Sequence, residues 1–219
     1  MKGVKLKAYL FEELPEKAQE NLIDIQTENN SLDWDNYFAD DVINDWAEVL
    51  KEKGFHDAII NYSGFCSQGD GASFTCSYID LNKLSEVLAL IPEGKKKRYA
   101  VIFERLLEKA SVKRTNSRYY HEQSTSLVML NRLDHYGHSR AQKALQEFID
   151  DNYNFIKEYI VALNVEIYQN LKEDYESHTS TERAREQLIE KDYHYLYINN
   201  RTIEISDYTT GDKEIIELD

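Results

Sequence analysis

A glycine-rich segment lies between two stretches that have the composition of β-strands, and this arrangement constrains the fold more than any other feature. Residues 58–62 and 73–79 are rich in Ile, Phe, Tyr and Thr, and residues 63–74 between them read SGFCSQGDGASF. Glycine allows the positive φ angles that tight turns require. Two strands joined in this way predict an antiparallel hairpin.

Helical periodicity accounts for much of the remaining chain. Apolar residues recur at helical spacing from Glu12 to about residue 28, and again from Ser31 or Asp33 to Gly54, with a break expected at residues 29–31. The longest such pattern runs from Ser139 to about Tyr175. We expect a bend or break in it near Asp151 and Asn152, because a helix of that length rarely continues straight.

Shorter patterns complete the expected fold. They predict a strand over 4–10, helices over 81–90 and 95–107, a last helix that follows a capping box at 179–182, and a hairpin over 195–205. They also predict a hairpin within 112–133, with its turn near 114–117 and its returning strand from Tyr119 to Leu130. The sequence therefore predicts an α+β protein in which small antiparallel sheets and hairpins pack against several helices, including one long helix in the C-terminal half. We expect a single domain over residues 1–219, with a possible subdivision near 92–98 and with residues 179–219 packed on the same core.

The charge is strongly negative and unevenly distributed. The net charge is −14, with 40 acidic and 26 basic residues. Residues 12–57 contain fourteen acids against three bases, and residues 146–219 contain eighteen against seven. Residues 93–118 are basic, with nine bases against three acids. Such a field disfavours direct binding to nucleic acid or to a membrane and attracts basic partners, although charged runs also serve solubility alone.

Few cysteines and no long apolar run indicate a reducing compartment. The chain has two cysteines, Cys66 and Cys76, and no stretch apolar enough to span a membrane or to act as a signal peptide. The sequence therefore predicts a cytoplasmic protein. The two cysteines lie on either side of Gly69 and Gly71 and could face each other across the hairpin, or could simply be small buried apolar residues.

The helix expected before Gly54 has two contrasting faces. Large apolar residues recur along one face, and carboxylates occupy the other: Asp35, Asp40, Asp41, Asp45, Glu48 and Glu52. We expect the apolar face to be core. The carboxylate face is a candidate surface for binding a basic partner, because carboxylates at helical spacing can imitate a row of phosphates.

The glycine segment is a candidate ligand site. Its polar and glycine residues could form a nest of amide groups for an anion or hydrogen-bond a small molecule: Ser67, Gln68, Gly69, Asp70, Gly71 and Ser73. It is not a phosphate-binding P-loop, because no Gly-Lys-Ser/Thr follows, and Asp70 would repel a phosphate. The alternative is a tight turn whose polar groups satisfy its own backbone.

Catalytic and metal-binding features are sparse, and no motif names a reaction. His121 could act as a general base for Ser67 or Ser73 if the fold brought them together, and Asp70 is a further candidate. His135 and His138 beside Asp134 could contribute to a metal site, but the pair lacks further ligands and is also typical of surface histidines. We therefore expect neither a metal nor a cofactor.

The run from Ser63 to Phe74 resembles a family of short proteins encoded by bacteriophages and other mobile elements. Members carry nearly the same residues, with a variable position where this chain has Cys66. The resemblance extends loosely to residues 14–18 and 119–121, and to the C-terminal helix and hairpin. It implies a phage setting, in the host cytoplasm, rather than an activity, and some members are labelled antitoxin-like.

Three functional hypotheses follow from these features. The first is a phage-encoded accessory or anti-defence protein, of the anti-CRISPR or antirestriction kind, that inhibits a host nucleic-acid-binding protein or nuclease through its acidic surfaces. The second is a protein or enzyme that binds a small molecule or nucleotide at residues 63–74. The third is an antitoxin-like protein that neutralises a toxic partner.

Overall fold

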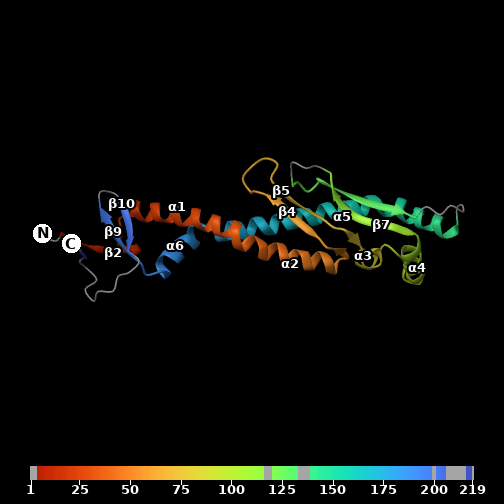
Figure 1. Ribbon diagram of the computed structural model, residues 1–219, viewed down its shortest axis with the longest axis horizontal. Coiled ribbons are helices and arrows are strands. Elements are labelled where there is room, and N and C mark those ends of the chain that lie inside the picture. Colours follow the sequence, from red (N-terminus) through yellow and green to blue (C-terminus); the bar gives the residue numbers. More distant parts are fainter. Residues whose placement is uncertain (1–3, 116–119, 133–138, 199–200, 206–215, 219) are drawn as a thin grey trace. The chain divides into compact units, whose positions relative to one another are not determined.

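The computed structural model describes residues 4–115, 120–132, 139–198, 201–205 and 216–218. The chain has mixed helices and strands, and its sheets are small and antiparallel, as predicted. Its internal contacts divide it into two compact units, one made of residues 1–39 and 173–219 and the other of residues 40–172. Both boundaries lie inside helical segments, and neither lies near residues 92–98. Figure 1 labels the helices and several strands of the two units.

The first unit combines segments from both ends of the chain. It contains β1 (Val4–Leu6), β2 (Ala8–Leu10), η1 (Phe11–Glu13), α1 (Glu16–Asp33), α6 (Thr181–Glu190), β9 (His194–Ile198), β10 (Arg201–Ile205) and β11 (Ile216–Leu218). β9 lies between β10 and β2, and β1 pairs with β11. Its apolar cluster is formed by Phe11, Leu14, Ala18, Leu188 and Tyr195. The C-terminal helix and hairpin thus pack on the N-terminal segment.

The helix break expected at residues 29–31 is wrong. α1 continues through the π-helical turn η2 (Trp34–Phe38) into α2 (Ala39–Glu52) without a gap. Asn30 is buried, and its side chain accepts a hydrogen bond from Gln26 Nε2 and donates one to the carbonyl of His178. The asparagine is therefore used for packing within its unit, and neither glycine nor proline stands nearby to end the helix.

The second unit contains hairpins and short helices together with most of the long helix. Its elements are α2, β3 (Phe55–His56), β4 (Ile59–Ser63), β5 (Gly71–Thr75), β6 (Tyr78–Ile79), α3 (Leu81–Val87), η3 (Glu93–Lys95), α4 (Lys96–Leu106), β7 (Leu107–Arg114), β8 (Thr125–Asn131) and α5 (Arg140–His178) up to Lys172. The predicted glycine hairpin is confirmed, because β4 and β5 pair in antiparallel register from Ile59↔Thr75 to Ser63↔Gly71. Gly54 follows α2 with a φ of 97°, as its position predicts.

The long helix predicted in the C-terminal half is confirmed, and of the bend or break expected near Asp151 and Asn152, the break does not occur. α5 is helical throughout, and the Asn152 side chain donates to the carbonyl of Phe148 one turn earlier. This local bond leaves the main-chain ladder intact. Two further boundaries differ from those predicted: β8 begins at Thr125 instead of near 119, and the cap of α6 is Ser180, whose hydroxyl accepts from Arg183 N.

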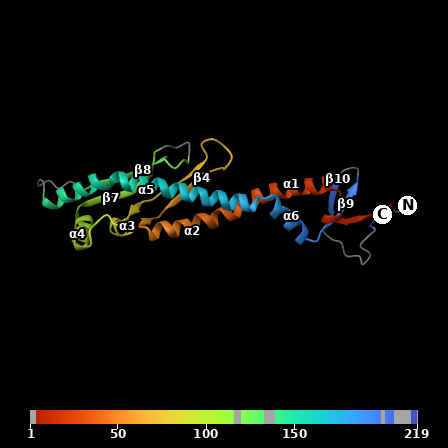
Figure 2. The ribbon, with the colours of Figure 1, turned by 180° about the vertical axis from the view of Figure 1, so that it is seen from behind.

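Hairpin β7–β8 lies along α5, and hairpin β4–β5 lies beside it (Figures 1 and 2). A single bridge between Cys76 and Val112 joins the end of the glycine hairpin to β7. Fully buried apolar side chains from both hairpins and from α5 fill this unit, among them Phe74, Val112, Leu145, Ile156 and Leu163. The burial of these side chains positions the loop at 63–74 and the turn before β8 on the long helix.

Candidate functional site

Asp70 organises the glycine loop from within. Its Oδ2 accepts hydrogen bonds from the backbone amides of Cys66 at 2.8 Å and Ser67 at 2.6 Å, and its own amide donates to Ser67 O at 3.1 Å. A carboxylate that accepts amide hydrogens stabilises a turn that would otherwise leave these donors to solvent. Two amide groups of this loop are therefore already bound to an anion of the chain itself.

Two of the glycines are required by their surroundings. Gly64 has a φ of 49°, and a Cβ there would lie 3.1 Å from the Asp70 carboxylate. A Cβ on Gly71 would lie 2.8 Å from the carbonyl oxygen of Tyr120, closer than real contacts allow. Gly69 also has a positive φ, of 102°, but nothing lies within 4 Å of a Cβ placed there. The loop thus closes over Asp70 at one side and packs against residues 120–121 at the other.

Aromatic stacking attaches the loop to the long helix. The ring of Phe65 stacks between Tyr62 of β4 and Tyr168 of α5, with centroid distances of 5.8 and 5.7 Å. Beyond the loop, Ala72 and Phe74 are fully buried. Most of the residues from Ser63 to Phe74 therefore have a structural role.

The predicted ligand residues separate into two groups. Ser67, Gln68 and Gly69 are exposed at the tip, and Asp70 is half-buried in its turn. Gly71 and Ser73 are buried, and the hydroxyl oxygens of Ser73 and Ser124 lie 3.3 Å apart. Of the six residues, the side chains open to a ligand at this tip are those of Ser67 and Gln68.

His121 lies next to Gly71 through its backbone, and its ring contacts its own neighbours. The ring Nδ1 is 3.0 Å from Glu122 Oε2 and 3.4 Å from Gln123 N. The carbonyl of His121 accepts from the Ser124 hydroxyl at 2.6 Å. The connection from Ser73 through Ser124 therefore ends on the His121 main chain rather than on its imidazole.

A buried asparagine that the sequence patterns did not single out holds this region together. Asn164 of α5 is fully buried, and its Oδ1 accepts from the amide of Phe74 at 3.0 Å. Its Nδ2 donates to the carbonyl of Glu122 at 2.9 Å and to the Thr125 hydroxyl at 3.3 Å. The sequence holds one sign of this role: Asn164 is a polar residue between Leu163 and Ile167, on the apolar face of a long helix. A polar side chain in such a place is usually hydrogen-bonded.

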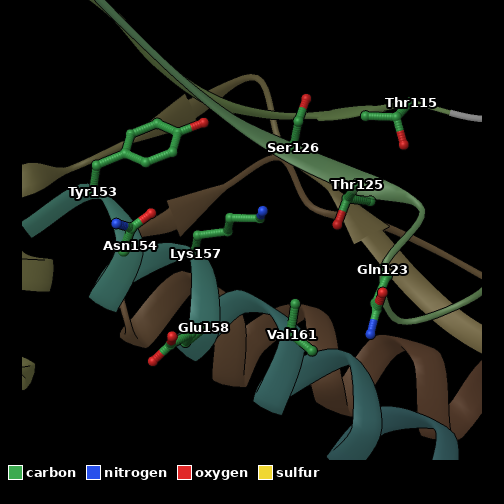
Figure 3. Close-up of a pocket in the computed structure, with 9 residues that line it drawn as sticks. All are labelled: Thr115, Gln123, Thr125, Ser126, Tyr153, Asn154, Lys157, Glu158 and Val161. Carbon is green, nitrogen blue, oxygen red and sulfur yellow. The ribbon is translucent and has the colours of Figure 1, made fainter.

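A cavity of about 540 Å³ lies beside this asparagine, between α5 and the start of β8. Most of its lining residues are polar in type, and they come from the residue after β7, the turn before β8, β8 and α5: Thr115, Gln123, Thr125, Ser126, Tyr153, Asn154, Lys157, Glu158 and Val161 (Figure 3). No residue of the 63–74 loop lines it. The cavity and the loop are connected through Asn164, which bonds to Phe74 and to Thr125.

The carboxylates predicted as a partner-binding surface are exposed. Asp40, Asp41, Asp45, Glu48 and Glu52 lie on α2 in the second unit, and Asp35 lies on η2 in the first. The opposite face of α2 is held by the fully buried Leu50 and by Trp46, whose indole donates to Asn170 of α5 at 3.1 Å. Glu48 pairs with Lys51 at 3.0 Å, and both side chains are more than half exposed.

The two cysteines are free thiols in different environments. Cys66 is exposed in the loop, whereas Cys76 is buried. Burial raises the pKa of the Cys76 thiol to about 11, because the thiolate would lose its hydration. Because both thiols are free, the contact across the hairpin that the sequence allowed is not a disulfide. Of the two thiols, Cys66 is the one that solvent reaches.

The described residues contain neither a metal-binding cluster nor a membrane-spanning helix. In that part of the chain no group of three or more His, Cys, Asp or Glu side chains is placed to hold a metal ion. Asp134, His135, His138 and the Tyr119 portion of the predicted strand lie outside the described residues. Of the helices described, none combines the length and apolarity needed to cross a membrane.

The architecture defines an α+β protein whose hairpins pack on one long helix, and comparison with known proteins identifies its family. Residues 38–181 match the model of a family described as a domain of unknown function, DUF8835. The chain belongs to this family, because the match covers more than half of its length. The matched residues include the whole of the second unit. No curated protein and no solved structure matches the chain.

Proposed function

We propose that this protein is an accessory binding protein that inhibits a nucleic-acid-binding protein or nuclease of its host by covering a basic surface. The observation that carries the proposal is the row of carboxylates on α2 formed by Asp41, Asp45, Glu48 and Glu52. These positions are spaced by four, three and four residues, which places them on one face of the helix, and all four are exposed.

The row is presented on a fixed support. Leu50 and Trp46 attach the opposite face of α2 to its unit, so the carboxylates keep their spacing without first ordering a flexible segment. A preorganised row loses less entropy on binding than a mobile one. Within the described residues, Asp41, Asp45 and Glu52 form no ion pair, so their charges are not neutralised locally.

The charge density of the carboxylate row sets the expected strength of its binding to a basic partner. At a rise of about 1.5 Å per residue, the four carboxylates span roughly 16 Å, or about one charge per 5 Å. A strand of duplex DNA carries about one charge per 3.4 Å along the axis. The row therefore imitates a short piece of one strand only in part, and we expect binding that moderate salt weakens.

We place this inhibitory activity in a host cell infected by a bacteriophage. The resemblance of residues 63–74 to phage-encoded proteins favours an anti-defence role of the anti-CRISPR or antirestriction kind, exercised in the host cytoplasm. An antitoxin-like role would use the same surface against a basic toxin. The identity of the captured partner separates these two roles.

The test is affinity capture with the full chain as bait in a host lysate, followed by identification of the retained proteins. We expect a nucleic-acid-binding protein that is released by about 0.5 M salt and displaced by duplex DNA. The variant D41N/D45N/E48Q/E52Q should weaken capture by about tenfold or more, since exposed charge pairs contribute about 0.2–1 kcal/mol each.

A matched variant controls for loss of charge alone. E104Q/E108Q/D151N/E166Q also neutralises four exposed acids of the second unit, but none lies on α2. This variant should bind like the unaltered chain. Equal loss with both variants, or a partner that salt and DNA do not displace, would contradict the proposal.

Ligand binding at residues 63–74 is a second candidate, and the exposed tip favours it. Ser67 and Gln68 are the two side chains there that remain open to a small molecule. Q68A should then abolish ligand-induced stabilisation without changing the melting temperature of the free protein. Because Asp70 holds the turn itself, D70A would lower that temperature whether or not a ligand binds.

A further inference from the structure

The cavity between α5 and β8 has the composition of a polar ligand site. Its volume of about 540 Å³ falls in the range of about 300–1,000 Å³ that is usual for small-molecule pockets. Most of the lining residues carry a hydroxyl or an amide group, and Val161 and the Tyr153 ring add apolar surface. All the lining residues belong to the second unit, so the site is complete within it.

One cation extends into this cavity. Lys157 projects from α5 toward Thr125 and the start of β8, whereas the carboxylate of Glu158 points away from it (Figure 3). In the part of the chain that the structure describes, Lys157 forms no ion pair. An ammonium group among hydroxyl and amide groups, without a carboxylate partner, is suited to bind the anionic group of a ligand.

The neutral groups around Lys157 retain hydrogen-bonding capacity. The Thr125 hydroxyl accepts from Asn164, so its own hydrogen can be donated. The side-chain amides of Gln123 and Asn154 each offer donors and an acceptor. The Tyr153 hydroxyl is already used, because it donates to the carbonyl of Leu127 at 3.0 Å. Tyr153 therefore contributes its ring.

The lining is also held in place before any ligand binds. Asn164 ties Thr125 and the carbonyl of Glu122 to α5, and the amide of Thr115 donates to the carbonyl of Ser124 at 2.8 Å. The Tyr153 bond fixes β8 to the same helix. These contacts come from the framework rather than from the exposed loop tip, which favours a preformed site.

We propose that this cavity binds a small phosphorylated sugar, with Lys157 at the phosphate and with Thr125, Gln123 and Asn154 at the sugar hydroxyls. Among the described lining residues Lys157 is the one cation, which matches one phosphate group, and the several neutral donors and acceptors match a hydroxylated body. The proposal is independent of the acidic row on α2. It also places the ligand away from residues 63–74.

The test is calorimetric titration of the full chain at low salt with ribose 5-phosphate, adenosine 5′-monophosphate, adenosine and inorganic phosphate. We expect at least one of the two phosphorylated sugars to bind with a Kd below about 1 mM and more tightly than adenosine or inorganic phosphate. Stronger binding of the nucleotide than of ribose 5-phosphate would assign the Tyr153 ring to the base. Equal binding of inorganic phosphate would overturn the role of the sugar.

Variants test the assignment of the residues. K157M should weaken binding by about tenfold or more, because it removes the charge-assisted contact to the phosphate, and it should leave the melting temperature unchanged. K83M, which removes an exposed lysine of α3 outside the cavity, should bind like the unaltered chain. Unchanged affinity in K157M would overturn the proposal.

Amide chemical shifts recorded during the titration locate the ligand. The proposal predicts shifts at Gln123, Thr125, Asn154 and Val161 and none at residues 66–69. Shifts confined to residues 66–69 would place the ligand at the glycine loop and would overturn the assignment to this cavity, even if the affinities were as expected.

Discussion

At the scale of single residues, the 63–74 loop depends on a carboxylate that it contains. Asp70 accepts two amide hydrogens from Cys66 and Ser67, and Gly64 leaves the space in which this carboxylate lies. The sequence suggested a ligand loop because glycines and polar residues alternate there. The same residues also build a turn that is complete without a ligand, and no pattern in the sequence separates these two outcomes.

Replacing Asp70 should therefore affect stability. D70A removes two hydrogen bonds to a charged acceptor, and we expect a loss of about 1–3 kcal/mol in the free energy of unfolding, measured by urea denaturation. Q68A, at the exposed tip of the same loop, should change it by less than about 0.5 kcal/mol. Equal effects of the two substitutions would show that the Asp70 contacts contribute little.

Gly71 offers a sharper steric test. A methyl group there would lie 2.8 Å from the Tyr120 carbonyl oxygen, so G71A must displace the segment before β8 or the hairpin itself. We expect a loss of about 1–3 kcal/mol. The matched control is G94A, since nothing lies within 4 Å of a Cβ placed on Gly94. G94A should be neutral or slightly stabilising.

The thiols should differ in reactivity by a large factor. The exposed Cys66 should react with a disulfide reagent at pH 8 in the native protein. Cys76 has a pKa raised to about 11 by burial, so only about one molecule in a thousand carries its thiolate at that pH. Counting the thiols that react before and after addition of denaturant should give one and then two. Two fast thiols in the native protein would contradict the burial of Cys76.

At the scale of elements, hairpins were predicted better than helix boundaries. The glycine hairpin and the long helix follow from local patterns that tertiary contacts do not change. The helices do not break at residues 29–31 or near Asp151 and Asn152, because Asn30 and Asn152 bond within their surroundings instead of ending a helix. The cavity beside Asn164 requires α5 and β8 to lie together, and this distant pairing leaves no local signal.

Asn164 is the residue on which the arrangement of these elements most depends. N164A leaves the Phe74 amide and the Glu122 carbonyl without their partner in a buried region, and we expect a loss of about 2–4 kcal/mol. Hydrogen exchange at Phe74 should accelerate more than exchange in α2. N170A, which removes one exposed bond to Trp46, should cost less than about 1 kcal/mol.

At the scale of the whole molecule, most of the negative charge lies in the first unit, whereas the family match covers the whole of the second unit. The first unit, residues 1–39 and 173–219, has 21 acids and 9 bases, a net charge of −12. The second unit, residues 40–172, has 19 acids and 17 bases, a net charge of −2. The second unit is nearly neutral overall, so the row on α2 is a local feature of it and not part of a uniformly acidic surface.

This division predicts that the family-matched residues behave as an independent domain. The fragment 38–181 contains the whole second unit with its buried side chains, and its 22 acids and 17 bases give a net charge of −5. We expect it to unfold in one cooperative transition, followed by circular dichroism, because the apolar residues that stabilise the unit are all present. A fragment without a cooperative transition would contradict the division.

The folded fragment then separates the two possible sources of partner binding. If the row on α2 captures the partner, the fragment should retain it at comparable affinity, and D41N/D45N/E48Q/E52Q should remove it from the fragment as from the full chain. The excess charge of the full chain would then contribute mainly to the rate of association, since long-range attraction is screened beyond about 8–10 Å at moderate salt. Capture by the full chain but not by the folded fragment would instead assign the partner to the strongly acidic first unit.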